Sequence, residues 1–251
     1  MIRLVTYADD RMSISADNLV RSSLLHGIDS AHAYTREDLE PDFIMMAEPT
    51  INESKGSGLY IWKPHFVFRA MYNAEDGDIL IYADAGQTII SNVQPVIDRM
   101  YQDVMMFSNG WNHMDWCKMD VMQVICPGVN DEGHDTDIEI WDKQAQASLI
   151  FFRVSPESRK FVKEWMLWCL MPGFCDNSPS VLPNVPTFQE TRWDQSIITC
   201  LGIKYGYRLH WFPSSTNWHN KDQHPNDNYP AIVDHHRKRN PGATGGTDSE
   251  W

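Results

Sequence analysis

The chain has 251 residues, of which 42% are hydrophobic, and a formal net charge of −13. This length is enough to bury one sizeable core. The negative charge argues against a nucleic-acid-binding protein or a polybasic membrane binder, because both need a basic surface. No run of 18 apolar residues occurs, so we expect no transmembrane segment.

The cysteines and the N-terminus point to a cytoplasmic protein, or to the host cytoplasm if the protein is viral. The five cysteines include no Cys-x-x-Cys pair, so we expect reduced thiols and no zinc site. Residues 1–5 lack the long apolar region of a signal peptide and are expected to begin a first strand.

The first third of the chain predicts the opening of a doubly wound α/β sheet. Residues 2–7 alternate as in a short strand. Apolar residues in 15–26 have helical spacing, and Gly27 follows as a C-cap. Residues 31–34 fit a second strand. Strand, helix, strand in this order is typical of such a sheet.

A glycine-containing segment and a buried strand come next. Residues 54–58 are expected to form a flexible loop, and Pro64 suits the first turn of a helix that continues to about residue 72. Residues 78–83 are almost continuously apolar, which predicts a central strand buried on both faces. This strand ends at Asp84.

The rest of the chain continues the alternation of helices and strands, with no internal repeat and no clear linker. We therefore expect one domain over residues 1–240 and a disordered tail over 241–251. The predicted elements are a helix at 92–103, a strand at 104–107, a surface loop at 128–137, a strand at 147–154, a helix at 156–170, a loop at 175–188, a helix at 194–205 and a final strand at 207–212.

Three polar features are candidates for chemistry, and each also has a purely structural interpretation. Asp84 follows the clearest strand, where open α/β sheets bind ligands, but it could equally be a turn residue. Asp194 begins a predicted helix with Gln195, and N-capping explains it on its own. The run 235–239, His-His-Arg-Lys-Arg, is either a solvated basic tail or a metal ligand followed by a phosphate clamp.

Taken together, these motifs resemble the small bacterial and viral glycosyltransferases of the GT-A fold. The resemblance covers residues 3–240, and the ordered set is more specific than any single piece. Its motifs are Gly-Leu-Tyr-Ile-Trp-Lys-Pro at 58–64, Asp-Ile-Leu-Ile-Tyr-Ala-Asp-Ala-Gly at 78–86, Asp-Trp-Cys-Lys-Met-Asp at 115–120, the strand–helix unit at 146–165, Asp-Asn-Ser-Pro-Ser at 176–180, Asp-Gln-Ser at 194–196 and His-His-Arg at 235–237.

The resemblance implies a single α/β domain whose mostly parallel sheet is flanked by helices. It also implies a metal site, because GT-A enzymes hold Mn²⁺ or Mg²⁺ on the donor diphosphate with an Asp-x-Asp motif at a strand end. The matching triplet here is Tyr82-Ala83-Asp84, so the motif is degenerate and keeps only its second carboxylate. The resemblance thus implies Asp84 and His236 as metal ligands, with His235 as the alternative to His236.

The resemblance further implies roles for residues along the donor. Asp194 and Gln195 match the pair that faces the donor sugar and are the expected catalytic residues. The expected donor-binding residues are Thr6, Tyr7, Ala8, Lys63, Ala83, Asp84, Arg237 and Lys238.

The function that this resemblance implies is transfer of a sugar from a UDP- or GDP-sugar to a glycan or other hydroxyl acceptor, as in hexosyltransferases. Two alternatives stay open. One is a nucleotide- or carbohydrate-binding module without catalysis, which the missing first aspartate motivates. The other is a metal-dependent phosphohydrolase of nucleotide sugars, which would need more clustered carboxylates than Asp84 alone.

Overall fold

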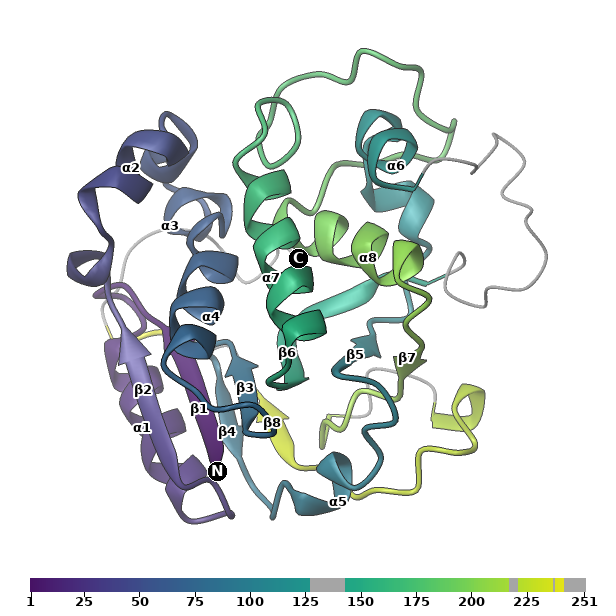
Figure 1. The fold of residues 1–251 in the computed structure, drawn as a ribbon. Coiled ribbons are helices and arrows are strands. Elements are labelled where there is room, and N and C mark those ends of the chain that lie inside the picture. The colour runs from purple at the N-terminus through teal and green to yellow at the C-terminus, as the bar shows by residue number, and fades with distance from the viewer. Residues whose placement is uncertain (127–142, 217–220, 237, 242–251) are drawn as a thin grey trace.

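The computed structural model describes residues 1–126, 143–216, 221–236 and 238–241 (Figure 1). The predicted loop at 128–137, the predicted tail beyond residue 241, and Arg237 lie outside these ranges. Among the described residues, no helix combines the length and the apolar character needed to span a membrane.

A six-stranded mixed sheet with strand order β2-β1-β3-β6-β5-β7 forms the centre of the fold. All its strands run in one direction except β6, which is antiparallel to both of its neighbours. The predicted α/β class with a mostly parallel sheet is therefore confirmed. The strands are β1 Ile2–Tyr7, β2 Ser30–Tyr34, β3 Ile79–Ala83, β5 Val104–Ser108, β6 Ala145–Arg153 and β7 Leu209–His210; β4 Gln87–Ile89 pairs separately with β8 Val233–His235.

The central strand β3 shows why its sequence is almost continuously apolar. Every residue of β3 is buried, because helices or loops cover both faces of the sheet. Side chains of a strand alternate between faces. Leu80 and Tyr82 therefore join one hydrophobic core, whereas Ile79 and Ile81 join the other.

Helices cover the two faces unequally (Figure 1). The larger core packs α4, α6, α7 and α8 against the sheet, and the smaller core includes residues of α1, α5 and β8. The α-helices are α1 Ser13–Leu24, α2 Pro41–Ala47, α3 Gly56–Leu59, α4 Trp62–Tyr72, α5 Gln94–Ile97, α6 Met119–Ile125, α7 Pro156–Cys169 and α8 Asp194–Lys204; short 3₁₀ turns are η1 Arg36–Asp38, η2 Thr50–Asn52, η3 His113–Trp116 and η4 Lys221–Gln223.

Three local expectations differ from the structure. The predicted helix at 92–103 is reduced to α5. The N–H groups of Arg99 and Met100 donate to carbonyl oxygens three residues back, as in a 3₁₀-helix, so the α-helix does not continue. The predicted strand at 207–212 is only β7, and it is not the last strand because β8 follows it. The segment expected as a flexible loop at 54–58 overlaps α3, an irregular turn in which Ser57 and Gly58 have non-helical φ and ψ.

Candidate functional site

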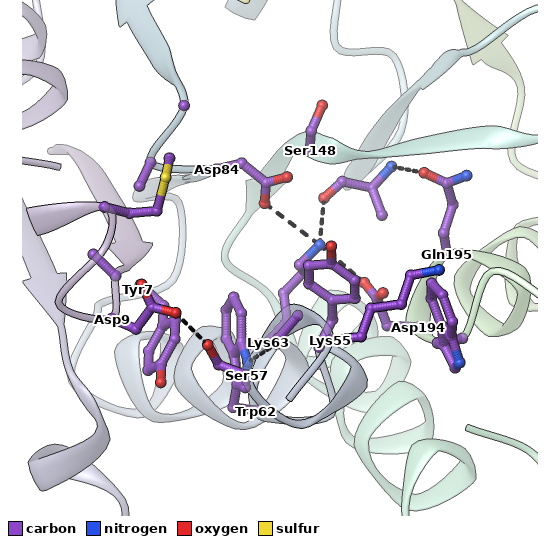
Figure 2. Close-up of a pocket in the computed structure, with 18 of the residues that line it drawn as sticks. Tyr7, Asp9, Lys55, Ser57, Trp62, Lys63, Asp84, Ser148, Asp194 and Gln195 are labelled. Atoms are coloured by element: carbon purple, nitrogen blue, oxygen red, sulfur yellow. Dashed lines mark hydrogen bonds and ion pairs between the residues drawn. The ribbon is translucent and has the colours of Figure 1, made fainter. Parts of the chain in front are cut away.

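A cavity of about 670 Å³ opens beyond the carboxyl ends of β1 and β3 and reaches the first residues of α8. Such a position is where open α/β sheets bind ligands, and the volume lies in the range of small-molecule sites. Tyr7, Ala8, Lys63, Asp84, Asp194, Gln195, His235 and His236 all line it. The fold thus brings most of the predicted site residues into one cavity (Figure 2).

Asp84 follows β3 directly and lines the cavity. Its Oδ1 accepts a hydrogen bond of 2.6 Å from the Tyr82 hydroxyl and lies 3.5 Å from the Lys63 ammonium. None of the described residues donates a hydrogen bond to Oδ2. The side chain is 31% exposed, so a ligand can reach this second oxygen.

Lys63 is the cation at the centre of the site, as Figure 2 shows. It lies in the first turn of α4, and its side chain is 3% exposed. Its Nζ lies 3.0 Å from Asp194 Oδ2 and donates to the carbonyl oxygen of Ala147 at 3.1 Å. Burial alone would lower the pKa of Lys63, but Asp194 and then Asp84 raise it above its ordinary value, so the ammonium stays charged.

Asp194 is buried beside Lys63 at the N-terminus of α8. Burial raises the pKa of this carboxyl to about 6, and the neighbouring Lys63 charge opposes the shift. A buried carboxyl with a perturbed pKa in a cavity is a candidate functional group. Asp194 does not act as the N-cap, which is Trp193, so simple capping does not explain it.

Two further interactions hold the start of α8 against the sheet. Gln195 Oε1 accepts from the Ala147 N–H at 3.2 Å, and its Nε2 donates to Gln144 Oε1 at 2.7 Å.

The residue before α8 has a strained backbone. Trp193 has a φ of 47°, an uncommon value for a residue with a side chain. Such strain is tolerated where the surroundings fix the backbone, and it clusters at functional sites.

The end of β1 forms the opposite wall of the cavity. Tyr7 lines it and stacks on Trp62 with ring centroids 3.9 Å apart. Beyond it, Asp9 accepts a hydrogen bond from the Ser57 hydroxyl at 2.6 Å and pairs with Arg11. Burial opposes ionisation of Asp9, but these hydrogen bonds lower its pKa below the ordinary value. Thr6 is 1% exposed and does not line the cavity.

The segment around α3 covers the cavity with an unusual backbone. Residues 56–60 all have positive φ, including the non-glycine residues Ser57, Leu59 and Tyr60. Gly58 is required, because a Cβ there would lie 2.8 Å from backbone atoms of Ile51. The segment is therefore a specifically shaped wall that places Ser57 and Tyr60 at the cavity.

The basic cluster at 235–239 begins at the last residue of β8 and meets the cavity through Arg239 and the two histidines. His236 accepts a hydrogen bond at Nδ1 from the Lys238 N–H at 2.9 Å, and its Nε2 lies 3.2 Å from Thr88 Oγ1. Burial lowers the pKa of His236, which favours the neutral imidazole. His235 is 5% exposed. Arg239 lines the cavity, whereas Lys238 is exposed and does not.

An aromatic wall with a buried arginine closes the side near α8. Trp111 and Trp116 stack with ring centroids 4.9 Å apart, and the Arg192 guanidinium lies 4.2 Å from the Trp116 ring centroid. Arg192 is 6% exposed, and its Nε has no hydrogen-bond partner among the described residues. Trp111 and Arg192 both line the cavity.

Sequence reasoning missed several of these residues. The sequence could have indicated two of them as site residues, because Asp9 closely follows the first strand and Arg239 belongs to the predicted basic run. Ala83, by contrast, was an expected donor-binding residue, yet it is 0% exposed and does not line the cavity. The other missed lining residues include Arg11, Lys55, Ser57, Tyr60 and Arg192.

No protein-family model and no curated protein matches the chain. Among solved structures, a glycosyltransferase involved in the glycosylation of the major capsid of PBCV-1 is 10% identical, with 93% of each chain covered and a TM-score of 0.49. Mouse xyloside xylosyltransferase 1 is 9% identical, with 93% of this chain and 96% of that chain covered and a TM-score of 0.45. The bifunctional glycosyltransferase WbbM is 12% identical at a TM-score of 0.47, over 84% of this chain, and this chain covers 38% of its length.

Proposed function

We propose that this chain is a glycosyltransferase that moves a sugar from a nucleotide-diphosphate donor, a UDP- or GDP-sugar, onto a hydroxyl of a glycan or similar acceptor. The observation that carries the proposal is the convergence of Asp84, Lys63 and Asp194 on one cavity at the strand ends. These residues belong to three of the motifs that resemble GT-A glycosyltransferases.

The residues at Asp84 fit a divalent ion on the donor diphosphate. Oδ2 of Asp84 accepts no hydrogen bond from the described residues, and carboxylate oxygen is a ligand that Mn²⁺ and Mg²⁺ prefer. His236, or His235, would complete the set, and His236 would first have to give up a hydrogen bond at one ring nitrogen. When bound, the ion would act as a Lewis acid that stabilises the diphosphate charge.

The chain's own residues supply the remaining chemistry. Transfer breaks the bond between the sugar C1 and a diphosphate oxygen, and it joins C1 to the acceptor oxygen, whose hydroxyl proton is released. The leaving diphosphate gains negative charge, which Arg239 can stabilise. Asp194, once ionised, can stabilise the positive charge that develops on the sugar.

The cavity has two chemically different ends, which we assign to the two substrates. Tyr7 and Ala8 at the end of β1 lie on the side proposed for the nucleotide. Trp111 and Arg192 lie on the side near α8. An exposed indole can stack on a sugar ring, and a guanidinium can donate to its hydroxyls, so we assign this side to the acceptor.

The carboxylates of the cavity argue against the phosphohydrolase alternative. A two-metal site needs several carboxylates that are available to ions. Asp9 is already engaged by Arg11 and Ser57, and Asp194 is engaged by Lys63. Of these three lining aspartates, Asp84 keeps an oxygen with no donor among the described residues.

Thermal unfolding with UDP, GDP and their sugar conjugates, with and without Mn²⁺, tests the donor, because selective binding stabilises the folded state. Release of nucleoside diphosphate then tests turnover. We expect metal-stimulated release by the wild type and none by Asp84→Ala, with the same fold. Asp42→Ala, on the exposed side of α2, is the control and should behave as the wild type.

The outcomes separate the candidate functions. Donor binding without any release, across a panel of acceptors and water, would favour the binding module. Release of sugar phosphate rather than nucleoside diphosphate would favour the hydrolase. Full metal-stimulated transfer by Asp84→Ala would contradict the assignment of Asp84.

A further inference from the structure

Three side chains with metal-binding atoms meet in the interior, on the side of α8 that faces η3. His113 begins η3, Cys117 follows that turn, and Cys200 lies in the middle of α8. Their exposures are 0%, 2% and 0%, respectively. None of the three lines the cavity, so this cluster is separate from the site of the proposed function.

Two of the three distances between these atoms match those between neighbouring ligands of one metal ion. His113 Nε2 lies 3.4 Å from Cys200 Sγ, and the sulfurs of Cys117 and Cys200 are 3.7 Å apart. The ligand atoms all lie within 4.8 Å of one another. Around tetrahedral zinc, with bonds of about 2.3 Å to sulfur and about 2.0 Å to nitrogen, neighbouring ligand atoms are roughly 3.5–3.8 Å apart. A disulfide would need about 2.05 Å between the sulfurs.

The hydrogen bonding of His113 also favours an ion. Its Nδ1 is buried with no hydrogen-bond partner among the described residues, and its Nε2 has only the weak sulfur partner of Cys200. A buried imidazole with so little polar contact is costly. A bond from Nε2 to a metal would offset that cost.

We propose that His113, Cys117 and Cys200 bind one Zn²⁺ ion. Binding forms two zinc–sulfur bonds and one zinc–nitrogen bond, and the two thiols release their protons to solvent without any change of oxidation state. Two thiolates balance the charge of the ion, so the buried complex is neutral. Three protein ligands leave the fourth tetrahedral position to a water molecule.

Such an ion would join elements that also shape the cavity. Cys200 lies on the same helix as Asp194, and His113 lies on the turn that carries Trp116 of the aromatic wall. Zinc would therefore fix η3 against α8 and hold the two sides of the proposed acceptor region together. Cysteine spacing in the sequence excluded a zinc motif because Cys200 lies 83 residues beyond Cys117.

Cobalt is the probe, because Co²⁺ bound by thiolates gives charge-transfer absorption that an ion on oxygen ligands does not. The full chain is stripped with a chelator under a reductant that does not bind metals, and it is then titrated with Co²⁺ and afterwards with Zn²⁺. We expect a thiolate band that saturates at about one equivalent and disappears as zinc displaces cobalt. Cys117→Ser and Cys200→Ser should lose the band, whereas Cys175→Ser, a buried cysteine outside the cluster, should keep it.

X-ray absorption of the zinc-loaded wild type identifies the ligands of the ion without a variant, so it tests the proposal even if a variant fails to fold. Two sulfurs at about 2.3 Å and one nitrogen at about 2.0 Å are expected around zinc. A shell of oxygen and nitrogen alone, no thiolate band in the wild type, or a band that persists in folded Cys117→Ser and Cys200→Ser would overturn the proposal. None of these readouts uses sugar transfer, so failure here is distinct from failure of the proposed function.

Discussion

The ammonium of Lys63 lies 3.0 Å from a carboxylate oxygen of Asp194, and both side chains are 3% exposed. The pair joins the first turn of α4 to the first turn of α8 across the floor of the cavity. Asp84 lies 3.5 Å from the same ammonium, so one lysine contacts both carboxylates. The proposed metal ligand and the proposed catalytic carboxylate are therefore electrostatically linked.

Lys63→Met should lower the free energy of unfolding by about 3–5 kcal/mol, because it leaves a buried carboxylate without its partner. Lys204→Met is the matched control. Lys204 pairs with Glu164 at 2.7 Å but is 39% exposed, so its loss should cost at most about 1 kcal/mol. Denaturant unfolding of the two variants measures the difference, and equal small losses would contradict the structural role of Lys63.

The pKa of Asp194, raised by burial to about 6 from an ordinary value of 3.8, predicts a pH effect on stability. Between about pH 4 and pH 6 the folded protein holds a proton that the unfolded chain has released. The stability contributed by this group therefore falls as pH rises through that window. Relative to Asp194→Asn, which does not titrate, the wild type should lose stability from pH 4 to pH 6. If the free energies of unfolding of the wild type and Asp194→Asn changed equally between pH 4 and pH 6, the raised pKa of Asp194 would be contradicted.

The same pKa predicts the acid limb of activity. Only ionised Asp194 can stabilise positive charge on the sugar, so the transfer rate should rise with pH through about 6. Asp194→Asn should lose transfer while still binding the bare nucleoside diphosphate. Near-normal transfer by this variant, or a rate independent of pH between 5 and 7, would exclude Asp194 from the reaction.

Substitution of the adjacent residues Arg239 and Lys238 tests which cation of the basic cluster binds the donor phosphates. Arg239 lines the cavity and Lys238 does not, so Arg239→Ala should weaken binding of the nucleoside diphosphate by about 1.5–3 kcal/mol. Lys238→Ala should change it much less. Calorimetric titration measures both affinities, and the reverse order would restore Lys238 as the phosphate contact expected from the sequence.

Trp111 tests the assignment of the acceptor side. Trp111→Ala should raise the KM for the acceptor while leaving the affinity for the nucleoside diphosphate unchanged, because the indole lies at the end of the cavity away from Tyr7. Tyr101→Ala, which removes a 74% exposed aromatic ring that does not line the cavity, is the control. Loss of nucleotide affinity in Trp111→Ala, with no change in acceptor KM, would show that the two ends are assigned in reverse.

The sequence by itself determined the α/β class and the position of Asp84. Both follow from local patterns: the continuous apolar run of β3 requires burial on both faces, and the first polar residue after such a strand must emerge at the sheet edge. Helical spacing and the start at Pro156 likewise predicted α7 closely. Short elements such as β8, with 3 residues, are too short to show a periodic pattern of apolar residues, so the sequence did not predict them.

Only the tertiary structure decided which side chains meet. Lys63 finds Asp194 because α4 and α8 each pack on α7 and on the same face of the sheet, and no periodicity in either helix encodes that meeting. Packing of η3 against α8 brings His113 and Cys117 to Cys200, although their spacing gives no metal motif. Local sequence pattern fixes an element and its buried face, whereas pairing between distant side chains depends on how the elements pack, and the chemistry of this site lies in those pairings.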